Sequence, residues 1–189
     1  MITSTQPLRA ILFDFVGVLL FPRAAGAVDP IASEIDGAIG QVTDDEAFKA
    51  KTLRKYGMDD AAFEAILRKV ADRYAPFTPL WGLLPGLSQL YHLGIINNGT
   101  YLTYPFFEIT YPLSQHFELF VSSAVEGIKK PDPAIYRRAA VRLGVTPGEC
   151  LYMDDAAENV AGAQKAGMQA IHWENREAGF QHFLEFMRK

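Results

Sequence analysis

Short, nearly continuous apolar runs recur along the chain, separated by segments in which apolar residues follow a helical spacing. Uninterrupted apolar runs are typical of strands that are buried on both faces of a parallel sheet. These runs predict strands over residues 9–13, 94–96, 119–121, 151–153 and 170–173. The segments between them predict helices over residues 87–93, 133–143, 158–166 and 180–187. Because strands and helices alternate, we predict an α/β fold, a three-layer sandwich with a parallel sheet between two layers of helices.

Residues 21–85 break this alternation, because the segment carries helix signals and no convincing strand. Helix signals begin near residues 31, 44 and 59, and proline at position 76 ends the last of them. We therefore predict a small helical domain over residues 21–85, inserted into a core domain formed by residues 1–20 and 86–189. The aromatic segment 101–117 supports no assignment.

The composition is that of an ordinary globular protein, with 49% hydrophobic and 21% charged residues and a formal net charge of −4. Lysines and arginines form no cluster, so we do not expect nucleic acid as a partner. Cys150 is the only cysteine, which excludes an intrachain disulfide and fits a reducing compartment. We expect a cytoplasmic location and no membrane partner.

The beginning of the chain imitates a secretory signal. Arg9 precedes an apolar run, and Ala25-Gly26-Ala27 resembles a cleavage site. Asp14 lies inside the apolar run, where a charge opposes insertion into a membrane. We therefore do not favour a signal peptide.

Polar residues stand at the point where three of the predicted strands end, and a lysine precedes a predicted helix. Because the carboxyl ends of parallel strands meet at the same edge of a sheet, we expect these side chains to converge. Carboxylates beside a lysine form a site for a hard cation such as Mg²⁺ together with an anion. The residues are Asp14, Asn97-Asn98, Lys130 and Asp154-Asp155.

These motifs, in this order, resemble those of the haloacid dehalogenase superfamily of hydrolases, which are mostly phosphatases. The family has a first motif that begins Asp-x-Asp-Gly, a strand that ends in Thr or Ser and often Asn, a lysine before Pro-Asp-Pro, and an acidic pair or Gly-Asp after a strand. The resemblance extends over nearly the whole chain and implies a Rossmann-like core with a small helical cap in the C1 position. The matching segments are Asp14-Phe15-Val16-Gly17-Val18-Leu19, Ile95-Ile96-Asn97-Asn98-Gly99, Lys130-Pro131-Asp132-Pro133 and Met153-Asp154-Asp155.

The resemblance implies that Asp14 is a nucleophile, which attacks phosphorus and becomes an aspartyl-phosphate. It also implies that Mg²⁺ is held by Asp14, Asp155 and the backbone carbonyl of Val16, with Asp154 as a further ligand or as a partner of the ligands. Lys130 would neutralise Asp14 and the phosphate oxygens. The residues implied in phosphate binding are Phe15, Val16, Asn97, Asn98 and Lys130, and the expected substrate is a small phosphorylated metabolite.

Two positions depart from the family pattern. Val16 stands where family phosphatases carry a second aspartate, which protonates the leaving group and then activates water. A positioned general acid–base contributes about 10²–10⁴ in rate, so we expect slow turnover. Asn97 stands where Thr or Ser is usual, and its amide can still donate a hydrogen bond to phosphate. Asn159 is expected in the first turn of a helix, where the family often has a third acid.

Two alternatives to a phosphatase stay open. The first is a catalytically inactive homologue that binds a phosphoryl ligand or a protein. The second is hydrolysis of a carbon–halogen or carbon–phosphorus bond. The acidic pair argues against a dehalogenase, because unneutralised carboxylates would repel an anionic substrate. The sequence does not decide between a monomer and a homodimer.

Overall fold

The computed structural model describes residues 6–23 and 29–188. The signal-like segment Ala25-Gly26-Ala27 lies outside the described residues. Among the helices that are described, none is both long enough and apolar enough to cross a bilayer.

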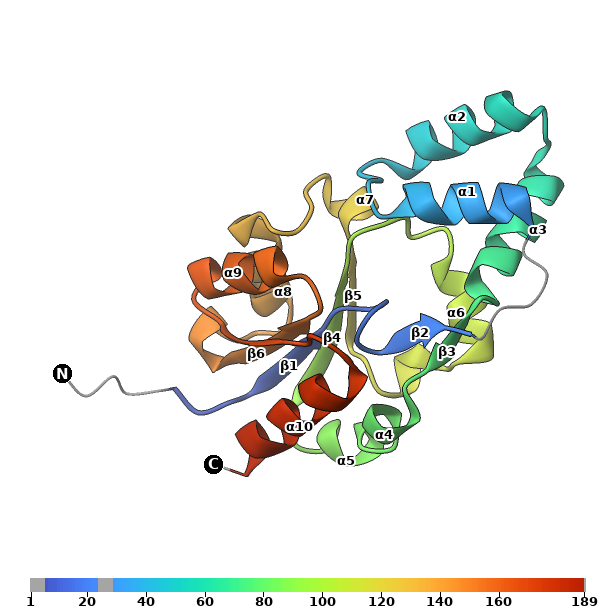
Figure 1. Ribbon diagram of the computed structural model, residues 1–189. Helices are drawn as coiled ribbons and strands as arrows, with labels where there is room; N and C mark the ends of the chain where they lie inside the picture. Colours follow the sequence, from blue (N-terminus) through green and yellow to red (C-terminus); the bar gives the residue numbers. More distant parts are fainter. Residues whose placement is uncertain (1–5, 24–28, 189) are drawn as a thin grey trace.

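A parallel sheet forms the centre of the described chain (Figure 1). Its strands are β1 (Ala10–Phe13), β4 (His92–Asn97), β5 (Leu119–Ser122), β6 (Cys150–Asp154) and β7 (Gln169–His172). They lie in the order β5-β4-β1-β6-β7, and every neighbouring pair is parallel. β1 is central, with Ala10 aligned to His92 on one side and to Cys150 on the other. The predicted α/β fold with a parallel sheet is confirmed.

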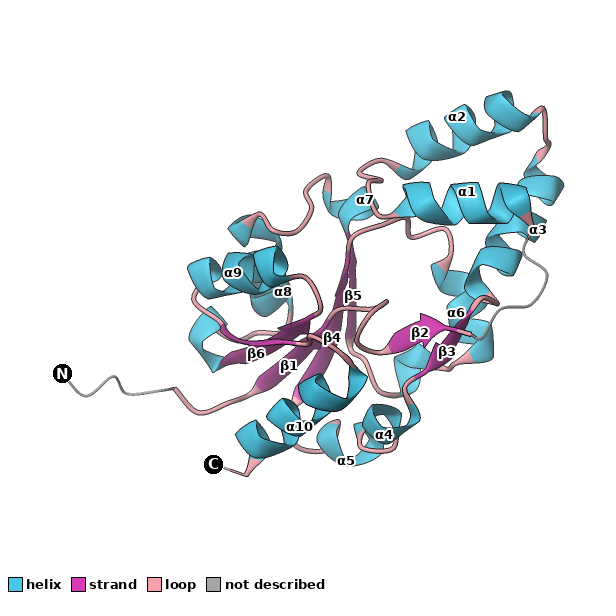
Figure 2. Cartoon of the chain, in the orientation of Figure 1, coloured by secondary structure: helices cyan, strands magenta, loops and turns pink. Residues whose placement is uncertain are grey.

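Helices cover both faces of this sheet (Figure 2). One layer consists of α8 (Pro133–Arg142) and α9 (Ala157–Ala166), and the other of α4 (Thr78–Trp81), α5 (Leu84–Leu87) and α10 (Arg176–Met187). The side chains of β1 alternate between the two layers. Ala10 and Leu12 pack in the cluster that contains α8 and α9, whereas Ile11 and Phe13 pack in the opposite cluster. All four are fully buried, which explains the unbroken apolar run.

The helical insertion is confirmed. It contains α1 (Pro30–Ile39), α2 (Asp45–Tyr56) and α3 (Asp60–Ala71). Each of these helices begins after an aspartate whose side chain accepts hydrogen bonds from backbone N–H groups of the first turn. α2 ends at Gly57, which takes the left-handed conformation with φ 60°.

The prediction that this segment lacks strands is wrong. β2 (Leu20–Pro22) and β3 (Tyr74–Pro76) pair antiparallel where the chain leaves and re-enters the core. Strands of this length carry no readable alternation, and their pairing depends on the whole insertion closing back on itself. The domain limits after residues 20 and 85 stay a prediction.

The predicted helix over residues 87–93 is also wrong. α5 ends at Leu87, and β4 begins at His92, whose N–H donates to the carbonyl of Arg9. Leu90, which lies between these two elements, is 75% exposed. Further elements in the described chain, including the unassigned aromatic segment, are α6 (Tyr104–Thr110), α7 (Ser123–Glu126) and two 3₁₀ turns (Leu113–Gln115 and Pro147–Glu149).

Candidate active site

Three carboxylates converge at the carboxyl edge of the sheet. Asp14 follows β1, and its backbone N–H donates to the carbonyl of Met153 at 2.8 Å. Asp154 ends the neighbouring strand β6, and Asp155 is the next residue. One oxygen from each of these carboxylates lies within 4.8 Å of the others. Carboxylates at this separation repel one another, and their hard oxygen donors fit Mg²⁺, whose positive charge would offset the repulsion.

The loop after β1 turns tightly towards Asp155. The N–H of Leu20 donates to the carbonyl of Phe15 at 2.9 Å, and the N–H of Gly17 donates to the carbonyl of Leu20 at 2.9 Å. Gly17 has φ +111°, and a Cβ atom on it would lie 2.5 Å from Oδ2 of Asp155. A glycine is therefore required here both for the backbone conformation and for the close approach of the carboxylate.

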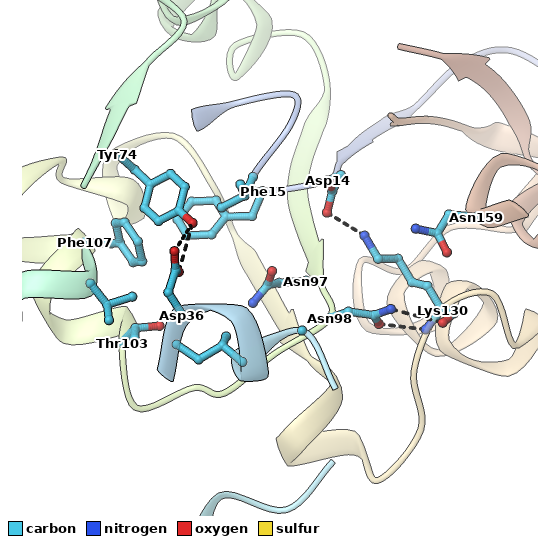
Figure 3. Close-up of a pocket in the computed structure, with 14 residues that line it drawn as sticks. Asp14, Phe15, Asp36, Tyr74, Asn97, Asn98, Thr103, Phe107, Lys130 and Asn159 are labelled. Atoms are coloured by element: carbon cyan, nitrogen blue, oxygen red, sulfur yellow. Dashed lines mark hydrogen bonds and ion pairs between the residues drawn. The ribbon is translucent and has the colours of Figure 1, made fainter. Parts of the chain in front are cut away.

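Lys130 is buried between two of the carboxylates. Its Nζ donates to Oδ1 of Asp14 at 2.5 Å and to Oδ2 of Asp154 at 2.8 Å. The Asn98 side chain holds the backbone of Lys130 in two directions (Figure 3). It accepts from the Lys130 N–H at 2.8 Å and donates to the Lys130 carbonyl at 3.0 Å. The ammonium group thus reaches Asp14 from a backbone that is fixed to the end of β4.

Both oxygens of Asp154 are occupied. Oδ2 accepts from Lys130 and from the Tyr152 hydroxyl. Oδ1 accepts from the backbone N–H of Ala156 at 2.8 Å and from Nδ2 of Asn159 at 2.9 Å. Asn159 lies in the first turn of α9, as predicted. Asp154 is therefore a buried acceptor for these donors, whereas Asp155 is exposed.

The site shifts the pKa values of its charged groups. The pKa of Asp14 is raised from 3.8 to about 7, because burial and the charges of Asp154 and Asp155 together outweigh the lowering effect of the Lys130 ammonium. Burial alone would lower the pKa of Lys130, but the charges of Asp14 and Asp154 outweigh burial and raise it. Burial, followed by the charge of Asp154, raises the pKa of Asp155. A cation bound among these carboxylates would favour their ionised forms.

A cavity of about 240 Å³ lies beside Asp14. The core contributes Asp14, Phe15, Val16, Asn97, Asn98 and Lys130 to its walls, so it gathers the residues predicted for catalysis and phosphate binding. Asp154 and Asp155 do not line this cavity. Val16 presents a partly buried aliphatic side chain at the position where the family's second acid would stand.

The insertion contributes further side chains that the sequence did not single out. Asp36 from α1 and Tyr74 from β3 line the cavity (Figure 3), where the Tyr74 hydroxyl donates to the Asp36 carboxylate. No pattern marks Asp36, because it is one acidic residue in a helix. Tyr152 was also missed, although strand periodicity could have found it. It lies two residues before Asp154 and therefore on the same face of β6.

Comparison with known proteins finds one family over most of the chain. Residues 8–167 match the model of the haloacid dehalogenase-like hydrolases. The chain is similar to a glyceraldehyde 3-phosphate phosphatase of Methanopyrus kandleri, with 28% identity over 87% of this chain and 83% of that protein. Other curated relatives match over shorter stretches, which cover 5% to 29% of their own lengths.

Solved structures share the fold. A predicted hydrolase of this kind from Porphyromonas gingivalis aligns with a TM-score of 0.69 and 19% identity, over 97% of this chain and 100% of that chain. An enzyme of Bacteroides thetaiotaomicron, crystallised with magnesium and inorganic phosphate, aligns with a TM-score of 0.68 and 17% identity, over 87% and 93% of the two chains. At these identities the likeness concerns the architecture alone.

Proposed function

The chain belongs to the haloacid dehalogenase-like hydrolases, and from this premise we propose that it is a Mg²⁺-dependent phosphatase of small phosphorylated metabolites. One observation carries the proposal. Lys130 joins Asp14 and Asp154 at hydrogen-bond distance, and Asp155 adds a third carboxylate, so that one oxygen of each lies within 4.8 Å of the others, close enough to hold a metal ion. The relative from Methanopyrus kandleri, which is a phosphatase by name, supports the same reaction class.

In the proposed reaction, Asp14 attacks the phosphorus atom of a phosphate monoester. A bond forms between a carboxylate oxygen and phosphorus, the ester P–O bond breaks, and the leaving alcohol takes up a proton from solvent. Water then attacks phosphorus and gives up a proton to solvent, the bond between phosphorus and the Asp14 oxygen breaks, and inorganic phosphate is released as Asp14 is regenerated. Lys130 offsets the negative charge that gathers on Asp14 and the transferred phosphoryl group.

Asp14, Asp155 and the backbone carbonyl of Val16 would hold the metal. When bound, Mg²⁺ supplies positive charge that reduces the repulsion between the Asp14 carboxylate and the phosphate. We assign Asp154 a positioning role instead of ligation, because its oxygens already accept hydrogen bonds from Lys130, Tyr152, Ala156 and Asn159. Backbone N–H groups of Phe15, Val16 and Asn98 and the Asn97 amide would bind the phosphate oxygens.

Val16 supports a second candidate function. An aliphatic side chain cannot protonate a leaving group or activate water, so the site would bind a phosphoryl group and release it slowly. In the limiting case the protein is a phosphoryl-ligand or protein-binding homologue without turnover.

The experiment is a panel of small phosphomonoesters assayed for phosphate release with Mg²⁺, with excess chelator, and with the variant Asp14→Asn. We expect release that requires Mg²⁺ and disappears in Asp14→Asn. Glu185→Gln is the matched control, because it changes an exposed carboxylate of α10 remote in sequence from the site. Release that is equal in wild type and Asp14→Asn would contradict the proposal.

The same samples separate the other functions. A phosphate mimic such as fluoroberyllate that raises the melting temperature with Mg²⁺, without any phosphate release, would indicate the inactive homologue. Halide release from a haloacid without added metal would indicate carbon–halogen hydrolysis.

A further inference from the structure

The cavity wall formed by the insertion carries a fixed carboxylate. Asp36 lies on α1 and is mostly buried, with 15% of its side chain exposed. The Tyr74 hydroxyl is 2.9 Å from each of its oxygens. Nη1 of Arg73 lies 3.2 Å from Oδ2 of Asp36 and also donates to the Ser33 hydroxyl at 3.0 Å. These contacts hold the carboxylate in one orientation, so it is a built feature of the cavity.

The insertion presents the Asp36 carboxylate to the cavity and keeps its cationic partner outside. Asp36 and Tyr74 line the cavity, whereas Arg73 is not among the lining residues and pairs with Asp36 from outside it. Among the lining residues, all of which lie in the described part of the chain, Lys130 is the only cation, and it is already paired with Asp14 and Asp154. In Figure 3, Asp36 lies across the cavity from Asp14 and Lys130, with Asn97 between them.

The size and the other walls limit what fits. The cavity volume of about 240 Å³ is below the range of roughly 300–1,000 Å³ that drug-sized ligands occupy. Phe15, Ile39, Val70 and Phe107 add apolar surface to the cavity walls. A short carbon chain with one polar group at each end matches this arrangement.

We propose that Asp36 is a specificity-determining residue, which selects phosphomonoesters whose far end carries a hydrogen-bond donor, a hydroxyl or an ammonium group, and disfavours those that end in a second anion. This inference rests on the proposed function, because it takes the phosphoryl group to be bound at Asp14. A carboxylate only accepts hydrogen bonds and has capacity left beyond the Tyr74 and Arg73 contacts. A second carboxylate or phosphate would instead face it at close range, and like charges in such a position weaken binding.

The test uses three ligands with the same carbon chain. They are 3-hydroxypropyl phosphate, 3-aminopropyl phosphate and 3-(phosphonooxy)propanoate, which end in a hydroxyl, an ammonium and a carboxylate. Their dissociation constants are measured by calorimetry with Mg²⁺, and kcat/KM is measured wherever phosphate is released. For the wild type we expect at least one donor-ended ligand to bind about tenfold more tightly than the carboxylate-ended one.

Two variants test whether the charge of Asp36 causes the preference for donor-ended ligands. Asp36→Asn keeps the shape and removes the charge, so the ratio of dissociation constants should fall to within about threefold. Tyr74→Phe removes the hydroxyl and keeps the charge, so the preference should persist, which also covers the case that Asp36→Asn does not fold. Glu64→Gln, an exposed carboxylate of α3, is the control and should leave all ratios unchanged.

The outcomes separate this inference from the proposed function. Phosphate release without any preference among the ligands, or a preference unchanged in Asp36→Asn, would overturn the role of Asp36 and leave the phosphatase intact. A preference in binding that Asp36→Asn abolishes, without phosphate release from any ligand, would support Asp36 and overturn the phosphatase. If neither the three ligands nor inorganic phosphate bind with Mg²⁺, both are overturned.

Discussion

Val16 is the residue that most affects the expected rate. It lines the cavity beside Asp14 and has no group that can transfer a proton. We predict that Val16→Asp raises kcat/KM for alkyl phosphates by about 10²–10⁴, because it restores a general acid–base at that position. The measurement is steady-state phosphate release with Mg²⁺.

Val16→Ala is the control for this substitution, since it removes the valine methyl groups without adding a carboxylate. A rise of equal size in both variants would show that space, not proton transfer, limits the rate. No rise in Val16→Asp would show that another group activates water or that the cavity is not a phosphatase site.

Asp14 makes the stability of the metal-free protein depend on pH. Its pKa is raised from 3.8 to about 7 in the folded state, so between these values the folded chain holds a proton that the unfolded chain has released. Between these two pKa values, the contribution of Asp14 makes the free energy of unfolding fall as pH rises, by at most about 1.4 kcal/mol per pH unit.

We predict that Asp14→Asn removes the contribution of Asp14 to the pH dependence of the free energy of unfolding between about pH 5.5 and 7. The measurement is urea unfolding without divalent metal, compared between the two proteins at each pH. The free energy of unfolding of the wild type relative to Asp14→Asn should fall with rising pH, and Mg²⁺ should reverse the trend because a cation favours the ionised carboxylate. If the free energies of unfolding of the wild type and Asp14→Asn differ by the same amount at every pH, Asp14 does not bind a proton in the folded protein as described.

At the level of elements, the loop after β1 determines the position of Asp155. Gly17 combines φ +111° with a backbone that approaches the carboxylate so closely that a methyl group would collide with it. We predict that Gly17→Ala destabilises the protein by about 1–3 kcal/mol and weakens the rise in melting temperature that Mg²⁺ produces, because Asp155 must move.

Gly37→Ala is the matched comparison. Gly37 lies in the last turn of α1, and a Cβ atom added to it would have no neighbour within 4 Å, so alanine there should stabilise the helix by about 0.5–1 kcal/mol. Its response to Mg²⁺ should match that of the wild type. If Gly17→Ala binds Mg²⁺ as the wild type does, the loop does not control Asp155.

The elements also show where sequence patterns succeed. The predicted strands of the parallel sheet are present because burial on both faces demands unbroken apolar runs, as in β1. The short strands β2 and β3 were missed because their pairing depends on how the intervening helices fold. The helix predicted over residues 87–93 was wrong because α5 ends at Leu87 and the chain is already in β4 at His92, with the exposed Leu90 between them.

At the scale of the molecule, the insertion and one face of the sheet share a single apolar cluster, in which Phe63 and Leu67 of α3 join Phe13 and Phe15. The rings of Phe15 and Phe107 meet edge to face at 4.9 Å. The predicted convergence of Asp14 and the acidic pair followed from the ends of parallel strands, and that of Lys130 from its place before a helix. Asp36 could not be predicted, because its place in the cavity depends on how the insertion packs against the core.

The central claim is that Asp14 accepts a phosphoryl group in a site held by Lys130 and the neighbouring carboxylates. An activated donor such as 4-nitrophenyl phosphate loses its leaving group without a proton, so the missing acid–base should slow mainly the second step, and the phosphoenzyme should accumulate. The direct measurement is acid quenching during turnover with Mg²⁺, followed by mass spectrometry of the peptides. We predict one phosphoryl group on Asp14, lost in Asp14→Asn and shorter-lived in Val16→Asp, whereas phosphate release without phosphorylation of Asp14 would contradict its role as the nucleophile.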